Sequence, residues 1–163
     1  MADTPSPAAG APLSTPGQGQ FSLDHIYLKD CSFESPLTPG VFINQPPPPE
    51  ASINIQTQIN ALEGRPEGRE VVLSVTVDAR TEDRSMFVCE VHMAALVTLG
   101  QTAGADEGRV LGARVPEALF PYARQAVSEL VVRGGFMPVM LQPIDFDAVY
   151  AQHAAQQSQT LDS

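Results

Sequence analysis

The chain has 163 residues, 43% of them hydrophobic, and its 19 acidic residues against 9 Lys and Arg give a net charge of −10. This length predicts one domain with a sizeable core, and the acidic balance argues against nucleic acid as a partner. The two cysteines, Cys31 and Cys89, fit a reducing compartment and do not form a disulfide framework.

Residues 1–20 are rich in Pro, Ala, Gly, Ser and Thr and show no apolar period, which predicts a disordered extension. The start of the chain has neither the basic segment nor the apolar core of a secretory signal, and no run approaches membrane-spanning length. We therefore expect a cytoplasmic protein without direct membrane insertion. Its folded domain is expected over residues 21–153, followed by a flexible tail over residues 154–163.

Alternating residues over 21–34 predict a half-buried strand. Its core face is assigned Phe21, Leu23, Tyr27, Cys31 and Phe33. Its reverse face is assigned Ile26 and Leu28 together with the acidic Asp24, Asp30 and Glu34. Residues 35–50 then predict a long crossover loop, because the four prolines at 46–49 cannot lie in a central strand. Val41, Phe42 and Ile43 are the apolar anchor of that loop.

Three further strands are predicted over residues 51–59, 70–79 and 86–99, and the short turns between them require antiparallel pairing. A flexible linker over 100–112 leads to a helix over 116–133, with Pro116 in its first turn and Gly134 as a left-handed stop. A second helix is predicted from an N-cap at Asp145 to His153. The predicted fold class is α+β, a four-stranded antiparallel sheet with two helices packed on one side.

The segment after the first helix is apolar without any helical or strand period. Its apolar residues include Phe136, Met137, Met140 and Leu141. Such a segment is either a covered core loop, an oligomer interface or an adaptable binding surface, since methionine-rich surfaces suit promiscuous binding. The sequence pattern leaves these three alternatives open.

Catalysis is not expected, because His25, His92 and His153 lie in no ligand-spaced motif and no phosphate loop is present. We accordingly expect no enzyme, no cofactor and no metal site, and a small enzyme or ligand-binding domain has no motif to support it. On the reverse face of the sheet, Asp30, Glu34 and Glu90 converge beside Val88 if their two strands are neighbours. That arrangement predicts either a docking surface or an ordinary solvated face.

Four segments together resemble the SecB protein-export chaperone family over nearly all of residues 21–157. The segments are IYLKDCSFESP (26–36), FVCEV (87–91), LGARVPEALFPYAR (111–124) and RGGFMPVMLQPIDFDAVY (133–150). The family often carries a tryptophan in the crossover loop, whereas this chain has no tryptophan and carries the four prolines there.

The resemblance implies an ATP-independent holdase that binds unfolded secretory precursors and delivers them to the SecA motor. It also implies a homotetramer, a dimer of dimers, with the long helices packed between subunits; Tyr122, Ala123 and Ala126 are the interface residues expected from it. An alternative with the same fold is a chaperone dedicated to a toxin–antitoxin pair. The acidic residues argue against that alternative.

Two sets of site residues follow from the resemblance. The basic, zinc-binding C-terminal segment of SecA is expected to dock on Asp30, Glu34, Val88 and Glu90, with the zinc belonging to the partner. Unfolded clients are expected to lie along the crossover loop, the second helix and its preceding loop. The client-binding residues assigned there are Val41, Phe42, Phe136, Met137, Met140, Leu141, Phe146 and Tyr150.

Overall fold

The computed structural model describes residues 21–100 and 106–161, and for residues 157–161 the backbone alone. The expected disordered extension over residues 1–20 lies outside the described residues. The elements, in chain order, are β1 (Phe21–Glu34), α1 (Gly40–Asn44), β2 (Glu50–Leu62), β3 (Arg65–Thr81), β4 (Arg84–Leu99), α2 (Glu107–Arg109), the π-helical turn η1 (Val110–Arg114), α3 (Val115–Arg133) and α4 (Phe146–Leu161).

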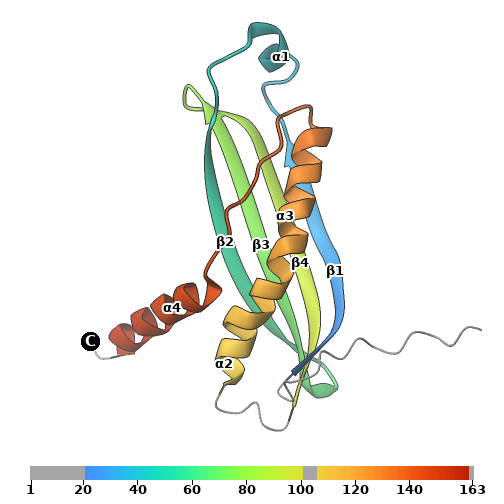
Figure 1. Ribbon diagram of the computed structural model, residues 1–163, viewed down its shortest axis with the longest axis vertical. Coiled ribbons are helices and arrows are strands. Elements are labelled where there is room, and N and C mark those ends of the chain that lie inside the picture. Colours follow the sequence, from blue (N-terminus) through green and yellow to red (C-terminus); the bar gives the residue numbers. More distant parts are fainter. Residues whose placement is uncertain (1–20, 101–105, 162–163) are drawn as a thin grey trace, which may run out of the picture.

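The four strands form one antiparallel sheet in the order β1-β4-β3-β2. The long helix α3 lies across one face of this sheet, over β3 and β4, and the segment after it returns along the same side to α4 (Figure 1). The predicted fold class is therefore confirmed. The order also makes β1 and β2 the two edge strands, which the sequence pattern did not establish.

The core lies between α3 and the two central strands, whose alternation was the clearest in the sequence. Its fully buried side chains include Val71, Leu73, Val75 and Val77 from β3, Cys89 and Val91 from β4, and Leu119, Ala123, Val127 and Val131 from α3. Burying a Val or Leu side chain stabilises a fold by about 1.5–3 kcal/mol. This row of apolar contacts therefore fixes the helix on the sheet.

Strand β1 is present as predicted, but its middle faces the other way. The register with β4 shifts between Leu23 and His25 and again between Leu28 and Asp30, and each extra residue inverts the alternation. Ile26 and Leu28 therefore pair with core-facing residues of β4, while Tyr27 lies on the reverse face. The predicted placement of these three side chains was wrong, whereas Asp30 and Glu34 keep their predicted face.

The connections depart from prediction at three points. The expected linker over 100–112 is helical from Glu107, because α2 and η1 lead without a break into α3. Gly134 is not the left-handed stop; its φ is −71°, and Gly135 at φ +87° takes that role. The crossover loop is not irregular throughout, since its apolar anchor forms the short helix α1.

The predicted N-cap of the last helix is confirmed. The Asp145 Oδ1 atom accepts a hydrogen bond of 3.0 Å from the Ala148 amide. Helix α4 then continues to Leu161, so the expected flexible tail is helical up to that residue. Residues 162–163 lie outside the described residues.

A polar cluster on the reverse face ties three strands together at Glu70 of β3. Lys29 Nζ lies 2.7 and 2.8 Å from its two carboxylate oxygens, Asn60 Nδ2 of β2 donates to it at 3.0 Å, and the Tyr27 hydroxyl also donates to it. These hydrogen bonds, Lys29 first, lower the pKa of Glu70 to about 2, while burial and the Glu70 hydrogen bond raise the pKa of Tyr27 to about 12. The fully buried Ala94, which pairs with Tyr27 on the intervening strand β4, leaves room for this crossing.

We predict that Glu70→Gln lowers the free energy of unfolding by about 1–3 kcal/mol at pH 7, because the half-buried Tyr27 and Asn60 and the ammonium group of Lys29 lose a charged acceptor. The pKa of Glu70 is depressed from its usual 4.5 to about 2, so its contribution is complete above pH 4.5 and is lost as the pH falls toward 2. The measurement is denaturant unfolding at pH 7 and at acidic pH, with Glu67→Gln at an exposed position near the start of β3 as control. A difference from wild type that stays constant down to pH 2 would contradict this account.

Candidate functional site

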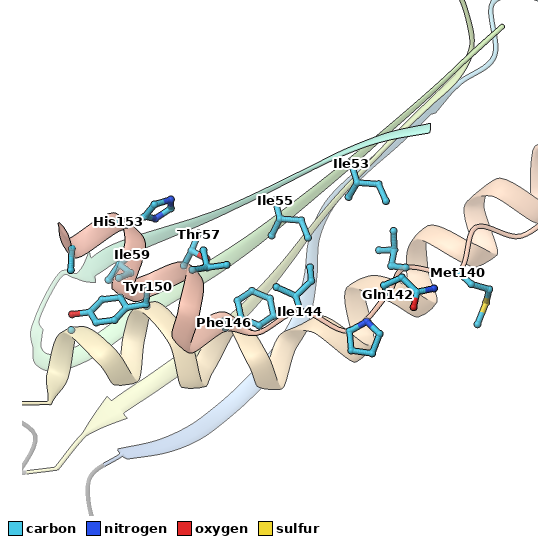
Figure 2. Close-up of a pocket in the computed structure, with 16 residues that line it drawn as sticks. Ile53, Ile55, Thr57, Ile59, Met140, Gln142, Ile144, Phe146, Tyr150 and His153 are labelled. Carbon is cyan, nitrogen blue, oxygen red and sulfur yellow. The ribbon is translucent and has the colours of Figure 1, made fainter. Parts of the chain in front are cut away.

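An apolar groove of about 720 Å3 runs between the edge strand β2 on one side and the segment 140–144 with α4 on the other (Figure 2). Its lining residues are Ile53, Ile55, Thr57, Ile59, Gly108, Gly112, Met140, Leu141, Gln142, Pro143, Ile144, Phe146, Val149, Tyr150, His153 and Ala154. A cavity of this size and composition suits an apolar ligand or an apolar stretch of polypeptide.

The β2 wall of the groove consists of isoleucines at alternate positions. Ile53, Ile55 and Ile59 share the face that carries the core side chains of β3, but α3 does not extend over them (Figure 1). Ile53 and Ile59 consequently remain 48% and 45% exposed. No site prediction from the sequence included these residues, although the alternation of isoleucine with Asn and Gln in β2 was visible. What the pattern did not reveal is that β2 is an edge strand.

The opposite wall has an exposed methionine at its rim and buried side chains at its floor. Met140 is exposed at the rim, whereas Leu141 and Phe146 are 1% and 4% exposed and belong to the core. Phe146 meets Phe120 of α3 edge to face, with ring centroids 5.7 Å apart. Of the predicted client residues, Leu141 and Phe146 thus form the floor of the groove and offer little surface of their own.

Tyr150 closes one end of the groove by packing on two glycines. A methyl group on Gly108 would lie 2.5 Å from the Tyr150 hydroxyl oxygen, and one on Gly112 would lie 2.7 Å from Tyr150 Cδ2. At the surface, an ion pair of 2.8 Å joins Arg109 of α2 to Asp147 of α4. Helix α4 is therefore anchored on the helical turn before α3 by close backbone approach.

The other predicted client residues lie at the far end of the molecule, beside α1. Phe136 lies 5.3 Å from Phe42 and 4.9 Å from Phe87, measured between ring centroids. Phe42 is half exposed, Val41 is half buried and Met137 is 85% exposed. The segment between α3 and α4 joins this aromatic cluster to the groove along one side of the sheet (Figure 1). The eight predicted residues therefore mark two ends of one apolar track rather than a single pocket.

The reverse face brings the four predicted docking residues together, because β1 and β4 are neighbours. Glu34 pairs with Val88, and in the adjacent rows Ser32 pairs with Glu90 and Asp30 pairs with His92. Asp78 of β3 pairs with Val88 from the other side and adds a fourth carboxylate, which the sequence reasoning missed. We call the surface formed by Asp30, Glu34, Val88 and Glu90 the acidic face.

The carboxylates of the acidic face are open to solvent. Asp30 and Glu34 are exposed, and no ion pair between described residues involves either of them. Glu90 is half buried and is hydrogen bonded to His92 at 2.5 Å. In contrast with Glu70, whose charge is compensated by Lys29, these groups are available to a cationic partner.

The three residues expected at an oligomer interface differ in what they expose. Tyr122 is half exposed and Ala126 is half buried on α3, whereas Ala123 is fully buried against the core. Ala123 therefore contributes to the contact of helix with sheet inside the subunit. Of the three, Tyr122 and Ala126 are the ones that retain solvent-accessible surface.

Within residues 21–100 and 106–161, no group of three His, Cys, Asp or Glu side chains is arranged to hold a metal ion. Nor does any helix of this described part combine the length and apolar character needed to span a membrane.

Comparison with known proteins gives one consistent result. The family model described as preprotein translocase subunit SecB matches residues 14–157. Proteins named protein-export protein SecB are similar throughout: the protein of Pseudomonas aeruginosa is 44% identical over 85% of this chain and 83% of its own length, and that of Nitrosococcus oceani is 41% identical over 85% and 84%. The protein of Hydrogenovibrio crunogenus is 38% identical over 86% and 93%.

A solved structure shares the fold. It is a SecB-like chaperone of Mycobacterium tuberculosis in complex with a ChAD peptide from the HigA1 antitoxin, with a TM-score of 0.62 and 16% sequence identity over 77% of this chain and 92% of that one. At that identity the similarity concerns the arrangement of sheet and helices alone.

We predict that Gly112→Ala loosens α4, because the added methyl group has no room beside the Tyr150 ring. Hydrogen exchange of the α4 amides, Val149 among them, should accelerate by about tenfold, or roughly 1.4 kcal/mol of local opening. Alanine has a higher helix propensity than glycine, which alone would stabilise this turn. A faster exchange in α4 would therefore have to come from the lost contact with Tyr150. Gly40→Ala is the control, since its nearest neighbour, Asn44 Nδ2, lies at 3.8 Å. Unchanged exchange in α4 would refute the packing role of Tyr150.

Proposed function

The chain belongs to the SecB family, and on that premise we propose that it is a protein-export chaperone that acts as an ATP-independent holdase. It binds unfolded secretory precursors in the cytoplasm, keeps them competent for translocation and delivers them to the SecA motor. The observation that carries the proposal is that one sheet separates two surfaces of opposite chemical character. The apolar track lies on the α3 side and the acidic face lies on the reverse side.

The apolar track supports binding of unfolded clients. An unfolded chain presents apolar segments of variable sequence, and a holdase must bury them without selecting one shape. The isoleucines of β2 supply a wall, the buried Leu141 and Phe146 a fixed floor, and Met137 and Met140 an adaptable surface. Affinity then comes from apolar area removed from water and requires no nucleotide.

The acidic face supports delivery to SecA. Three exposed or half-buried carboxylates around the half-buried Val88 match a basic, zinc-binding peptide segment, which offers cationic side chains and a small apolar contact. The zinc ion belongs to that partner segment. The alternative function, that of a chaperone dedicated to a toxin–antitoxin pair, is not proposed, because all four residues of the acidic face are present in this chain.

The proposed assembly is a homotetramer, a dimer of dimers with α3 between subunits. Tyr122 and Val132 are about half exposed on α3, so the helix retains apolar surface that a second subunit could remove from water. Their burial against a second α3 would supply the interface. Several grooves in one assembly would also let a long client bind at several points with higher overall affinity.

We predict opposite effects for one substitution on each surface. Ile53→Asp puts a charge into the β2 wall and should weaken binding of a reduced, alkylated model protein by about tenfold or more, because the charge loses hydration on binding. It should leave binding of the zinc-loaded C-terminal peptide of SecA unchanged. Glu90→Lys should abolish binding of the peptide and leave binding of the unfolded protein intact. Both affinities are measured by calorimetry.

Matched controls separate surface effects from net charge. Asn54→Asp adds the same charge as Ile53→Asp one residue along β2, on the opposite face of the sheet. Glu67→Lys makes the same charge change as Glu90→Lys at an exposed position near the start of β3. The proposed function fails if each control behaves like its partner variant, or if wild type binds neither ligand.

A further inference from the structure

A hydrogen-bonded chain of three residues crosses the acidic face from β3 to β4. Ser74 Oγ lies 2.6 Å from His92 Nδ1, and His92 Nε2 lies 2.5 Å from Glu90 Oε1. The His92 side chain is 26% exposed and that of Glu90 is 41% exposed. His92 is therefore partly enclosed within the acidic face, although no site prediction from the sequence included it.

The chemistry of the three groups sets the direction of the chain. An ionised carboxylate has acceptors alone, so His92 Nε2–H donates to Glu90. A neutral imidazole then has a lone pair on Nδ1, and the Ser74 hydroxyl donates to it. The Glu90 carboxylate thus selects the Nε2–H tautomer, and the Ser74 hydroxyl, which can donate or accept, matches it at Nδ1. One carboxylate oxygen is engaged by His92, and the second oxygen remains for a ligand.

The position of His92 in the sheet places it between docking carboxylates. It pairs with Asp30 on β1 and with Ser74 on β3, while Glu90 lies two residues earlier on its own strand. The next rows of this face carry Ser32, Glu34, Thr76, Asp78 and Val88. The two cations near these rows are already paired, Lys29 with Glu70 at 2.7 Å and Arg80 with Asp78 at 3.9 Å. His92 is therefore the group beside Asp30 and Glu90 that can gain a positive charge.

We propose, on the premise of the docking function above, that His92 is a positioning residue that holds Glu90 for a cationic partner segment and makes that docking weaken in acid. Histidine is the side chain that changes charge between pH 5 and 8. A proton on His92 adds a positive charge beside Asp30 and Glu90, and this charge reduces the attraction of the acidic face for a cationic peptide.

The test measures binding of the zinc-loaded C-terminal peptide of SecA to the full-length protein by calorimetry. At pH 7.5, His92→Phe keeps a ring but has no donor, and it should weaken binding roughly three- to tenfold, a range typical of the net contribution of one hydrogen bond. His92→Gln retains an N–H donor that reaches Glu90 and should stay within about twofold of wild type. Thermal unfolding of both variants reports whether they fold.

Two further readouts separate positioning from a structural role. Between pH 8 and pH 6, wild type should lose affinity relative to His92→Gln, because the variant cannot take up the proton. Any loss of zinc from the peptide affects both proteins equally and cancels in their ratio. In a Glu90→Gln background, His92→Phe should cause no further loss, since its effect passes through Glu90.

The outcomes distinguish this inference from the docking function itself. If wild type binds and Glu90→Gln weakens binding, but His92→Phe and His92→Gln match wild type at every pH, His92 has no positioning role and the docking function stands. A loss in His92→Phe that persists in the Glu90→Gln background also overturns the inference. If wild type does not bind, or Glu90→Gln binds as wild type does, both fail together. Should His92→Phe not fold, the pH ratio of wild type to His92→Gln decides alone.

Discussion

The pairing of β1 with β4 is the constraint on which the two surfaces depend. It brings the first strand of the chain beside the last, so that Asp30 and Glu34 meet Val88 and Glu90. The two bulges in β1 matter because each inverts the alternation once. With one bulge, Asp30 and Glu34 would face the core, where an unpaired carboxylate is costly. With two, the acidic residues return to the reverse face, and Tyr27 is free to reach Glu70.

The strand order that places β1 beside β4 also leaves β2 at the opposite edge. Helix α3 covers the central strands and leaves the isoleucines of β2 to the later segment and α4. The groove is the space that this incomplete cover leaves. Its floor is as rigid as the core to which Leu141 and Phe146 belong, and its far end is held by Tyr150 on the backbone of Gly108 and Gly112. Binding surface and stability are thus supplied by different residues of the same segment.

The parts predicted from sequence are those governed by local pattern. The alternation in β3 and β4 and the N-cap at Asp145 were confirmed because each depends on a few neighbouring residues. The faces of Ile26 and Tyr27 were wrong, because the bulges at Asp24 and Lys29 shift the alternation between them. The polar His25 and Lys29 within the assigned apolar face were the signal in the sequence. The β2 wall was missed because edge position follows from strand order, which no local signal encodes. The role proposed for His92 could not be predicted from sequence, because it depends on the contact with Ser74 on another strand.

The central claim is that the apolar track and the acidic face are separate surfaces on opposite sides of one sheet. The most direct test is to measure the affinity of the zinc-loaded C-terminal peptide of SecA for the protein alone and for the protein saturated with an unfolded client. The account predicts a ternary complex with peptide affinity unchanged within about twofold, or roughly 0.4 kcal/mol. Competition, in which a saturating client displaces the peptide, would contradict it.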